Sequence, residues 1–178
     1  DEYRLWSTFH PLYKNLSKEN LLKRLSKIFK HSHDEIIELY SDYISDENYG
    51  YLLSAIMTDL TFGSPVEELL SMKNNSYGYI FTPQSPLLNG VLGAFHASEL
   101  PYIFGVQNKL PYQKWSPDYR DKTAEVMQDA WVNFAKNGNP STNNFEWKPF
   151  SNSSNYALIK DSIKNINSPF KERYKLLN

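Results

Sequence analysis

One histidine of this sequence lies in a setting that favours chemistry. His96 occurs in the segment GAFHASELPYIFG, residues 93–105, where the small residues Ala94 and Ala97 lie close to it on either side. A neutral imidazole acts as a general base near neutral pH, and small neighbours leave room for a bound molecule beside it. Because a loop histidine is also commonly a simple hydrogen-bonding residue, the spacing alone leaves both interpretations open.

Neither the other three histidines nor any common active-site motif indicates a second reactive centre. His10 precedes a proline in an expected turn, where a surface role is favoured. His31 and His33 lie at the expected end of a helix, and their spacing does not place both on one helical face. The sequence contains no cysteine and no G-x-S-x-G, Walker, H-E-x-x-H or G-x-G-x-x-G motif. We therefore expect neither a metal site nor a cofactor.

Composition argues against several classes of partner. The 178 residues carry 19 Lys and Arg against 20 Asp and Glu, so no basic surface is expected for nucleic acid or for an anionic membrane. No apolar run approaches the roughly 20 residues that span a bilayer, and no signal-peptide pattern opens the sequence. With 40% hydrophobic residues, the length suits one globular domain with a sizeable core. The compartment is left open, with the cytoplasm favoured over secretion.

The hydrophobic pattern predicts several helices and few strands. Residues 18–31, behind a Ser17 N-cap, place their leucines on one helical stripe, and Gly138 is expected to end the longest helix, residues 117–137. Further helices are expected at 34–44, at 51–72 with an interruption near FGSP, and from Pro169 onward, and strands at 77–81 and 155–160. Several helices need a sheet to pack on, so this α/β chain is short of strands, and we expect the missing ones upstream of Asp1.

The segment around His96 resembles the catalytic-histidine signature of the type B carboxylesterases, the carboxylesterase and cholinesterase family of α/β hydrolases. Three further segments resemble that family in the family's own order: MTDLTFGSP at 57–65, DAWVNFAKNGNPS at 129–141 and FEWKPF at 145–150. Together they cover nearly the whole chain. The resemblance implies that residues 1–178 form the C-terminal portion of one carboxylesterase domain, with helices packed on a few strands of a mixed central sheet that is incomplete in this chain.

The resemblance also implies roles for individual residues. The opening segment DEYRLWSTF resembles the family's acid segment, with Glu2 in the position of the triad acid and His96 as the base. Leu5 and Trp6 follow the acid where the family often lines its gorge. We therefore expect Leu5 and Trp6 on the wall of the acyl or alcohol pocket.

Two other carboxylates belong to the segments that resemble the family. Asp59 lies in MTDLTFGSP, and Glu99 follows His96 by three positions. A carboxylate beside packed helices persists only when it is paired. We expect both to be buried, hydrogen-bonded structural groups rather than participants in the reaction.

The function implied by the resemblance is hydrolysis of carboxylic esters through an acyl-enzyme. α/β hydrolases order their triad as serine, acid and histidine, so a chain that opens at the acid lacks the serine and the oxyanion loop. We expect a small-molecule ester substrate, the N-terminal portion of the same domain as partner, and no activity from this chain alone. The alternative is a non-catalytic cholinesterase-like adhesion or binding protein. A self-sufficient binding module is disfavoured by the shortage of strands.

Overall fold

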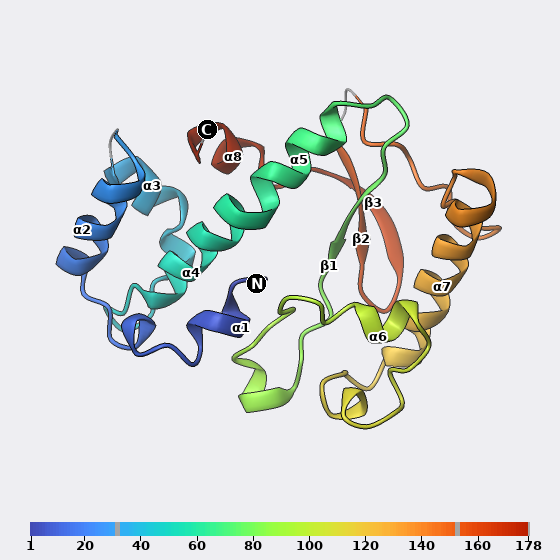
Figure 1. Cartoon of the computed structure of the whole chain (residues 1–178), viewed down its shortest axis with the longest axis horizontal. Helices are drawn as coiled ribbons and strands as arrows, with labels where there is room; N and C mark the ends of the chain where they lie inside the picture. Colours follow the sequence, from blue (N-terminus) through green and yellow to red (C-terminus); the bar gives the residue numbers. More distant parts are fainter. Residues whose placement is uncertain (31–32, 152–153, 178) are drawn as a thin grey trace. The chain divides into compact units, whose positions relative to one another are not determined.

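The computed structural model describes residues 1–30, 33–151 and 154–177, and they form two compact units (Figure 1). The helical unit comprises Asp1–Val66 and Phe170–Asn178, and the sheet unit comprises Glu67–Pro169. Helix α5, Ser64–Ser71, contributes residues to both. Each unit has its own hydrophobic core, so each positions its own part of the candidate site.

Short helices surround one apolar core in the helical unit. They are α1 Arg4–Ser7, α2 Lys18–Ile28, α3 His33–Leu39, α4 Gly50–Thr58 and α8 Lys171–Leu177, with 3₁₀ turns at Pro11–Tyr13 and Ser41–Tyr43. Ser17 caps α2 as predicted, since its hydroxyl accepts the Asn20 N–H at 3.3 Å. Leu21 and Leu25 of α2 are fully buried one turn apart, whereas Ile28 is exposed because α2 ends there and Phe29 takes the buried position.

The helix that follows α4 is continuous. A π turn, Asp59–Gly63, connects α4 to α5, so the interruption predicted at FGSP is a widened turn and not a break. Pro65 lacks an N–H and its ring crowds the carbonyl one turn earlier, and a π turn accommodates both effects without ending the helix. A Cβ at Gly63 would lie 2.3 Å from Tyr174 Oη, so glycine lets α8 approach the π turn closely.

A buried carboxylate in the π turn connects three elements of the helical unit. The Tyr40 hydroxyl donates to Asp59 Oδ2 at 2.7 Å, and Arg173 Nη1 of α8 lies 3.8 Å from the same oxygen. The guanidinium of Arg173 also lies over the rings of Tyr40 and Tyr43, at 4.7 and 5.3 Å from their centroids. Burial raises the pKa of Asp59 more than Tyr40 and Arg173 lower it. The expectation of a buried, hydrogen-bonded Asp59 is confirmed.

Replacing Asp59 by asparagine is expected to remove a pH-dependent contribution to stability. Because the pKa of Asp59 is raised in the folded state, its contribution is full below the ordinary carboxyl pKa of about 3.9 and is lost as the pH rises through the raised value. Asparagine keeps an acceptor for Tyr40 without the charge. The free energy of unfolding in urea should therefore be measured for both proteins at a series of pH values. The difference between the unmodified protein and Asp59→Asn should fall as the pH rises above about 4. A difference that rises over this range would contradict the prediction.

A three-stranded mixed sheet forms the centre of the sheet unit. Its strands are β1 Gly78–Phe81, β2 Asn155–Ile159 and β3 Ile163–Asn167, in the order β1-β2-β3. β1 and β2 are parallel, with Tyr79 opposite Ala157, and β2 and β3 are antiparallel. Both predicted strands are confirmed, and so is the mixed sheet of an α/β chain. β3 was not predicted, because its sequence IKNIN is mostly polar and its strand form depends on pairing with β2.

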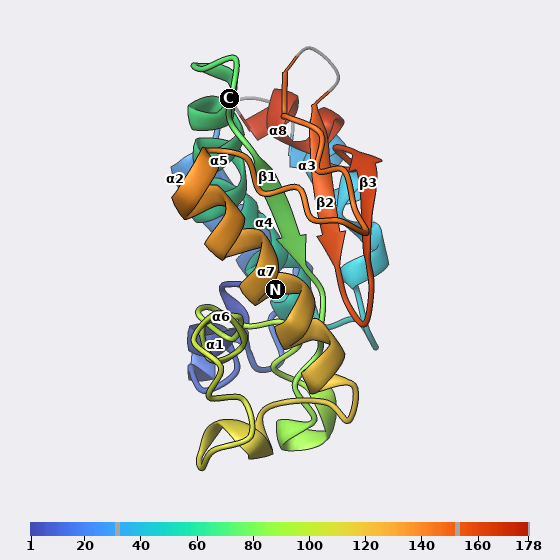
Figure 2. The ribbon, with the colours of Figure 1, turned by 90° about the vertical axis from the view of Figure 1, so that its right-hand side faces the viewer.

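One face of this sheet is covered by helix α7, Arg120–Asn137 (Figure 2). Ala124, Met127 and Ala130 of α7 are buried in the same cluster as the inward residues of β2. Gly138 ends α7 as predicted, with a left-handed φ of 68°, whereas the helix begins at Arg120 and not at Pro117. The longest predicted helix is thereby confirmed with a later start.

Candidate active site

The loop that carries His96 begins at the end of β1. Thr82 extends the pairing of β1, since its N–H and its hydroxyl both donate to Ile159 O, at 3.0 and 2.9 Å. Ser85 N then donates to Gly93 O at 3.0 Å and closes the loop. α/β proteins place binding and catalytic side chains at the carboxyl ends of parallel strands. His96 therefore belongs to a loop that starts at the carboxyl end of a parallel strand, where binding and catalytic side chains are commonly found.

Buried neighbours hold the backbone on both sides of His96. Phe95 is 5% exposed and packs edge-on against Trp115, with ring centroids 5.7 Å apart. The buried Ser98 donates its N–H to Phe95 O at 3.0 Å. Ala97 adopts a left-handed φ of 63°, which costs a non-glycine residue roughly 1 kcal/mol. The half-buried imidazole is thus presented by a loop whose backbone is fixed and locally strained.

Glu99 lies at the start of a one-turn helix, α6 Leu100–Ile103. Its backbone carbonyl accepts the N–H of Tyr102 at 3.0 Å. Its side chain is half-buried, so the expectation of a buried carboxylate is only partly met. The reason is the position of α6 at the surface of the sheet unit, where the adjacent Leu100 is 43% exposed.

The other described histidines occupy structural positions. His10 is an exposed surface residue. Its Nδ1 accepts the N–H of Leu12 at 3.2 Å and so caps the 3₁₀ turn Pro11–Tyr13. His33 Nε2 lies 3.4 Å from Phe29 O, and His31 lies outside the described residues. Among the residues that the structure describes, no three His, Asp or Glu side chains are grouped so that they could hold a metal ion. In the same part of the chain, no helix is both long and apolar enough to cross a membrane.

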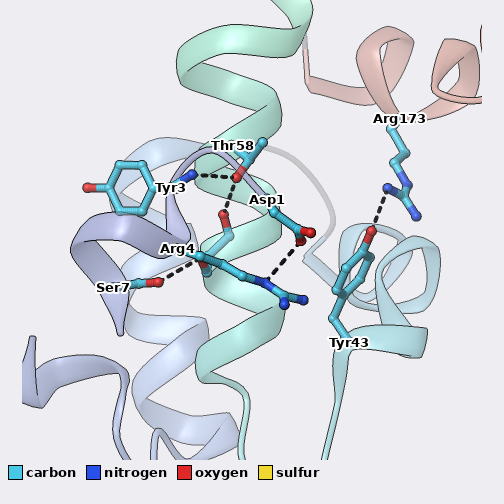
Figure 3. A network of polar contacts seen from close by, with 8 residues as sticks. Asp1, Tyr3, Arg4, Ser7, Tyr43, Thr58 and Arg173 are labelled. Carbon is cyan, nitrogen blue, oxygen red and sulfur yellow. Dashed lines mark hydrogen bonds and ion pairs between the residues drawn. The ribbon is translucent and has the colours of Figure 1, made fainter. Parts of the chain in front are cut away.

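The candidate acid, Glu2, lies in a turn of the helical unit. Its neighbours Asp1, Tyr3 and Arg4 lie beside α4 in Figure 3. Arg4 N donates to Asp1 O at 3.0 Å and closes this turn, and Arg4 Nε pairs with the Asp1 carboxylate at 3.0 Å. Tyr3 N donates to Thr58 Oγ1 of α4 at 3.1 Å. Glu2 is half-buried between these anchored neighbours. The backbone that carries the candidate acid is therefore fixed on both sides.

The two candidate pocket residues differ in exposure. Leu5 is half-buried, whereas Trp6 is 45% exposed. The indole of Trp6 stacks on Phe62 of the π turn, with centroids 6.1 Å apart and planes 12° apart. A stacked indole that faces solvent offers a rigid apolar surface. The placement of Leu5 and Trp6 on a pocket wall stays a prediction.

The predicted site residues are divided between the two units. Glu2, Leu5 and Trp6 belong to the helical unit, and His96 and Glu99 belong to the sheet unit. Within each unit the local backbone is held by hydrogen bonds and buried contacts. The pairing of Glu2 with His96 stays a prediction.

Two residues that contact the segment carrying Glu2 were not identified from the sequence. Ser54 and Thr58 lie one turn apart in the otherwise mostly apolar helix α4, GYLLSAIMT. Buried hydroxyl groups persist where they are hydrogen-bonded, so this spacing indicates a polar contact along one face of the helix. The pattern does not say which segment makes the contact. The structure shows that Thr58 contacts Tyr3 in the turn before α1 and that Ser54 contacts Ser7 at the end of α1.

Known proteins are similar to this sequence over much of its length. A family model described as "Carboxylesterase family" matches residues 7–177, a span that includes His96 and begins after Glu2. The sequence is 33% identical over 130 residues to para-nitrobenzyl esterase of Bacillus subtilis, covering 68% of this chain and 26% of that protein. It is 30% identical over 160 residues to bile salt-activated lipase of Rattus norvegicus, covering 81% of this chain and 25% of that protein. The chain thus spans about a quarter of the length of these curated relatives.

Solved structures share the fold. The structure of PNB esterase matches with a TM-score of 0.70 at 28% sequence identity, over 100% of this chain and 36% of that chain. A carboxylesterase from Geobacillus stearothermophilus matches with a TM-score of 0.80 at 22% identity, over 99% of this chain and 38% of that chain. At this lower identity the likeness concerns the fold alone.

Proposed function

This chain belongs to the carboxylesterase family, and we propose that it forms the C-terminal portion of one domain that hydrolyses carboxylic esters. Glu2 is then the acid and His96 the base of a Ser-His-Glu triad, and the serine comes from polypeptide outside these 178 residues. The substrate is a small-molecule ester. We call the polypeptide that contains both portions the full-length protein.

The observation that carries this proposal is the placement of His96 within the sheet unit. The loop that carries it begins at the carboxyl end of the parallel strand β1, and the buried residues Phe95 and Ser98 hold its backbone. A general base must keep one orientation through the reaction, and a fixed loop meets that requirement. The family match includes this whole loop.

The proposed reaction is acyl transfer. His96 accepts the hydroxyl proton of the serine while the serine oxygen attacks the ester carbonyl, and the imidazolium then donates that proton to the departing alcohol. A water molecule, deprotonated by His96, then attacks the acyl-enzyme. The imidazolium returns that proton to the departing serine oxygen, which releases the carboxylic acid and restores the serine hydroxyl and the neutral imidazole. Glu2 accepts a hydrogen bond from the imidazole, which fixes its tautomer and stabilises the imidazolium. This sequence of steps needs no metal and no cofactor.

The same proposal places Leu5 and Trp6 on the pocket wall. They follow Glu2 by three and four positions, and Trp6 presents a stacked indole with 45% of its surface exposed. An aromatic ring held in this way contributes apolar contact area with little loss of conformational entropy on binding. Such a wall suits the acyl or alcohol group of an ester.

Comparison of the full-length protein with the 178-residue chain tests the proposal. We expect the full-length protein to hydrolyse p-nitrophenyl acetate and to be labelled on one serine by a fluorophosphonate. The 178-residue chain alone should do neither, because it supplies no nucleophile and no oxyanion hole. If the 178-residue chain alone hydrolysed the ester and His96→Ala abolished that activity, the proposed division of the triad between two portions of the protein would be contradicted. A full-length protein that is neither active nor labelled would favour the adhesion or binding alternative.

A further inference from the structure

One face of α4 and the following π turn contacts four residues of the acid segment, which comprises residues 1–9. Side chains at helical spacing on this face each meet one residue of the segment, all within the helical unit. Figure 3 shows one of these contacts, between Thr58 and Tyr3. The pairs are Tyr51 with Arg4, Ser54 with Ser7, Thr58 with Tyr3, and Phe62 with Trp6. Because residues 51, 54, 58 and 62 recur about every 3.6 positions, a single helical stripe determines where the segment lies.

Two hydroxyl groups make the directional contacts of this stripe. Thr58 Oγ1 accepts the Tyr3 N–H at 3.1 Å and donates its own proton to Ser54 O at 3.0 Å. The hydroxyls of Ser54 and Ser7 lie 2.8 Å apart and are both buried. A buried hydrogen bond fixes both distance and direction, and the loss of one partner leaves the other group unsatisfied. Thr58 therefore holds the residue directly after Glu2, and Ser54 holds the end of α1.

The turn that carries Glu2, residues 1–4, leaves its backbone little freedom to move back into place if a contact with α4 is lost. Its backbone is enclosed by the bond from Arg4 N to Asp1 O and by the Asp1–Arg4 ion pair, whose side chains are each 22% exposed. The guanidinium of Arg4 lies 5.1 Å from the centroid of the Tyr51 ring, which ties the turn to α4 a second time. The direction in which the Glu2 side chain leaves the backbone thus depends on where α4 holds Tyr3.

We propose that Thr58 and Ser54 are positioning residues that act through Glu2, an inference that rests on the proposed function. A triad acid works by its orientation, since it holds the histidine in one tautomer and faces the imidazolium as it forms. A displacement of about 1 Å in such a group can lower the rate by roughly 10²-fold. Thr58 and Ser54 therefore contribute to kcat through the position of Glu2.

The first arm of the test is Thr58→Val in the full-length protein, with p-nitrophenyl acetate as substrate. Valine has a similar shape but leaves the Tyr3 N–H without its acceptor, so we expect kcat to fall by about 10- to 100-fold with KM unchanged. Thr58→Ser keeps the hydroxyl and should restore most of kcat. The matched control is Thr61→Val, the same substitution at an exposed position of the π turn, which should leave kcat unchanged.

The second arm repeats Thr58→Val in a Glu2→Gln background. If Thr58 acts through Glu2, the substitution lowers kcat in the unmodified protein and has no further effect once the acid is lost. An equal loss of kcat in both backgrounds, or no loss in either, would overturn the inference. The proposed function would still stand in that case, because Glu2→Gln alone would still lower kcat. An unchanged kcat in Glu2→Gln alone would overturn the acid assignment, and the positioning role with it.

Discussion

Replacing His96 by alanine in the full-length protein is expected to lower kcat for p-nitrophenyl acetate hydrolysis by roughly 10⁴- to 10⁶-fold, with little change in KM. If His96 is the proposed base, its loss leaves no group to take up the serine proton or to return it to the leaving alcohol. Substrate binding depends on the pocket walls, which the substitution leaves intact. Steady-state kinetics measure the effect, and an unchanged circular dichroism spectrum shows that the fold is retained.

The matched control for this prediction is His10→Ala. His10 is an exposed histidine whose Nδ1 accepts the Leu12 N–H in a surface turn, so its loss should leave kcat unchanged. A loss smaller than about 10-fold in His96→Ala would contradict the assignment of His96 as the base. It would favour another base in the full-length protein.

The largest loss of stability is expected from Gly50→Ala. Gly50 is buried at the start of α4, and a Cβ there would lie 1.9 Å from Tyr13 O and 2.9 Å from Tyr13 C, both backbone atoms. The two segments are pinned together, because Asn48 Oδ1 accepts the N–H groups of Leu16 and Gly50, each at 3.0 Å. Neither backbone moves away cheaply, so we expect the free energy of unfolding in urea to fall by about 4 kcal/mol or more.

Gly90→Ala separates this clash from the general cost of replacing a glycine. Gly90 has a left-handed φ of 85°, and a Cβ there would meet nothing within 4 Å. Its replacement should therefore cost only the backbone strain of about 1 kcal/mol. Equal losses in the two variants would contradict the steric argument for Gly50.

Local patterns predicted the elements whose signals are contained in short segments. Ser17 marks the start of α2, Gly138 marks the end of α7, and the apolar runs that become β1 and β2 are visible without any partner. Caps and left-handed glycines act within one turn of the chain, so their effect can be predicted before the fold is known. The resemblance to the type B carboxylesterases and the α/β class are likewise confirmed by the family match and the solved structures.

Features that depend on a distant partner could not be predicted in this way. β3 is a strand because β2 offers it hydrogen bonds, although its own residues are mostly polar. The helix continues past Pro65 through a π turn against which α8 packs, with Tyr174 filling the space beside Gly63. In both cases tertiary contact overrides local preference.

For the candidate site, the residue types and their order along the chain indicated which side chains have the chemistry. They identified His96 as a candidate base, with Glu2 as its acid through the family resemblance. How each segment is held became visible in the folded chain: the loop of His96 is held by the buried ring of Phe95, the turn of Glu2 by the hydroxyl of Thr58, and the end of α1 by the hydroxyl of Ser54. The physical reason is that residue type sets reactivity, whereas orientation comes from hydrogen bonds and packing between segments that are far apart in the chain.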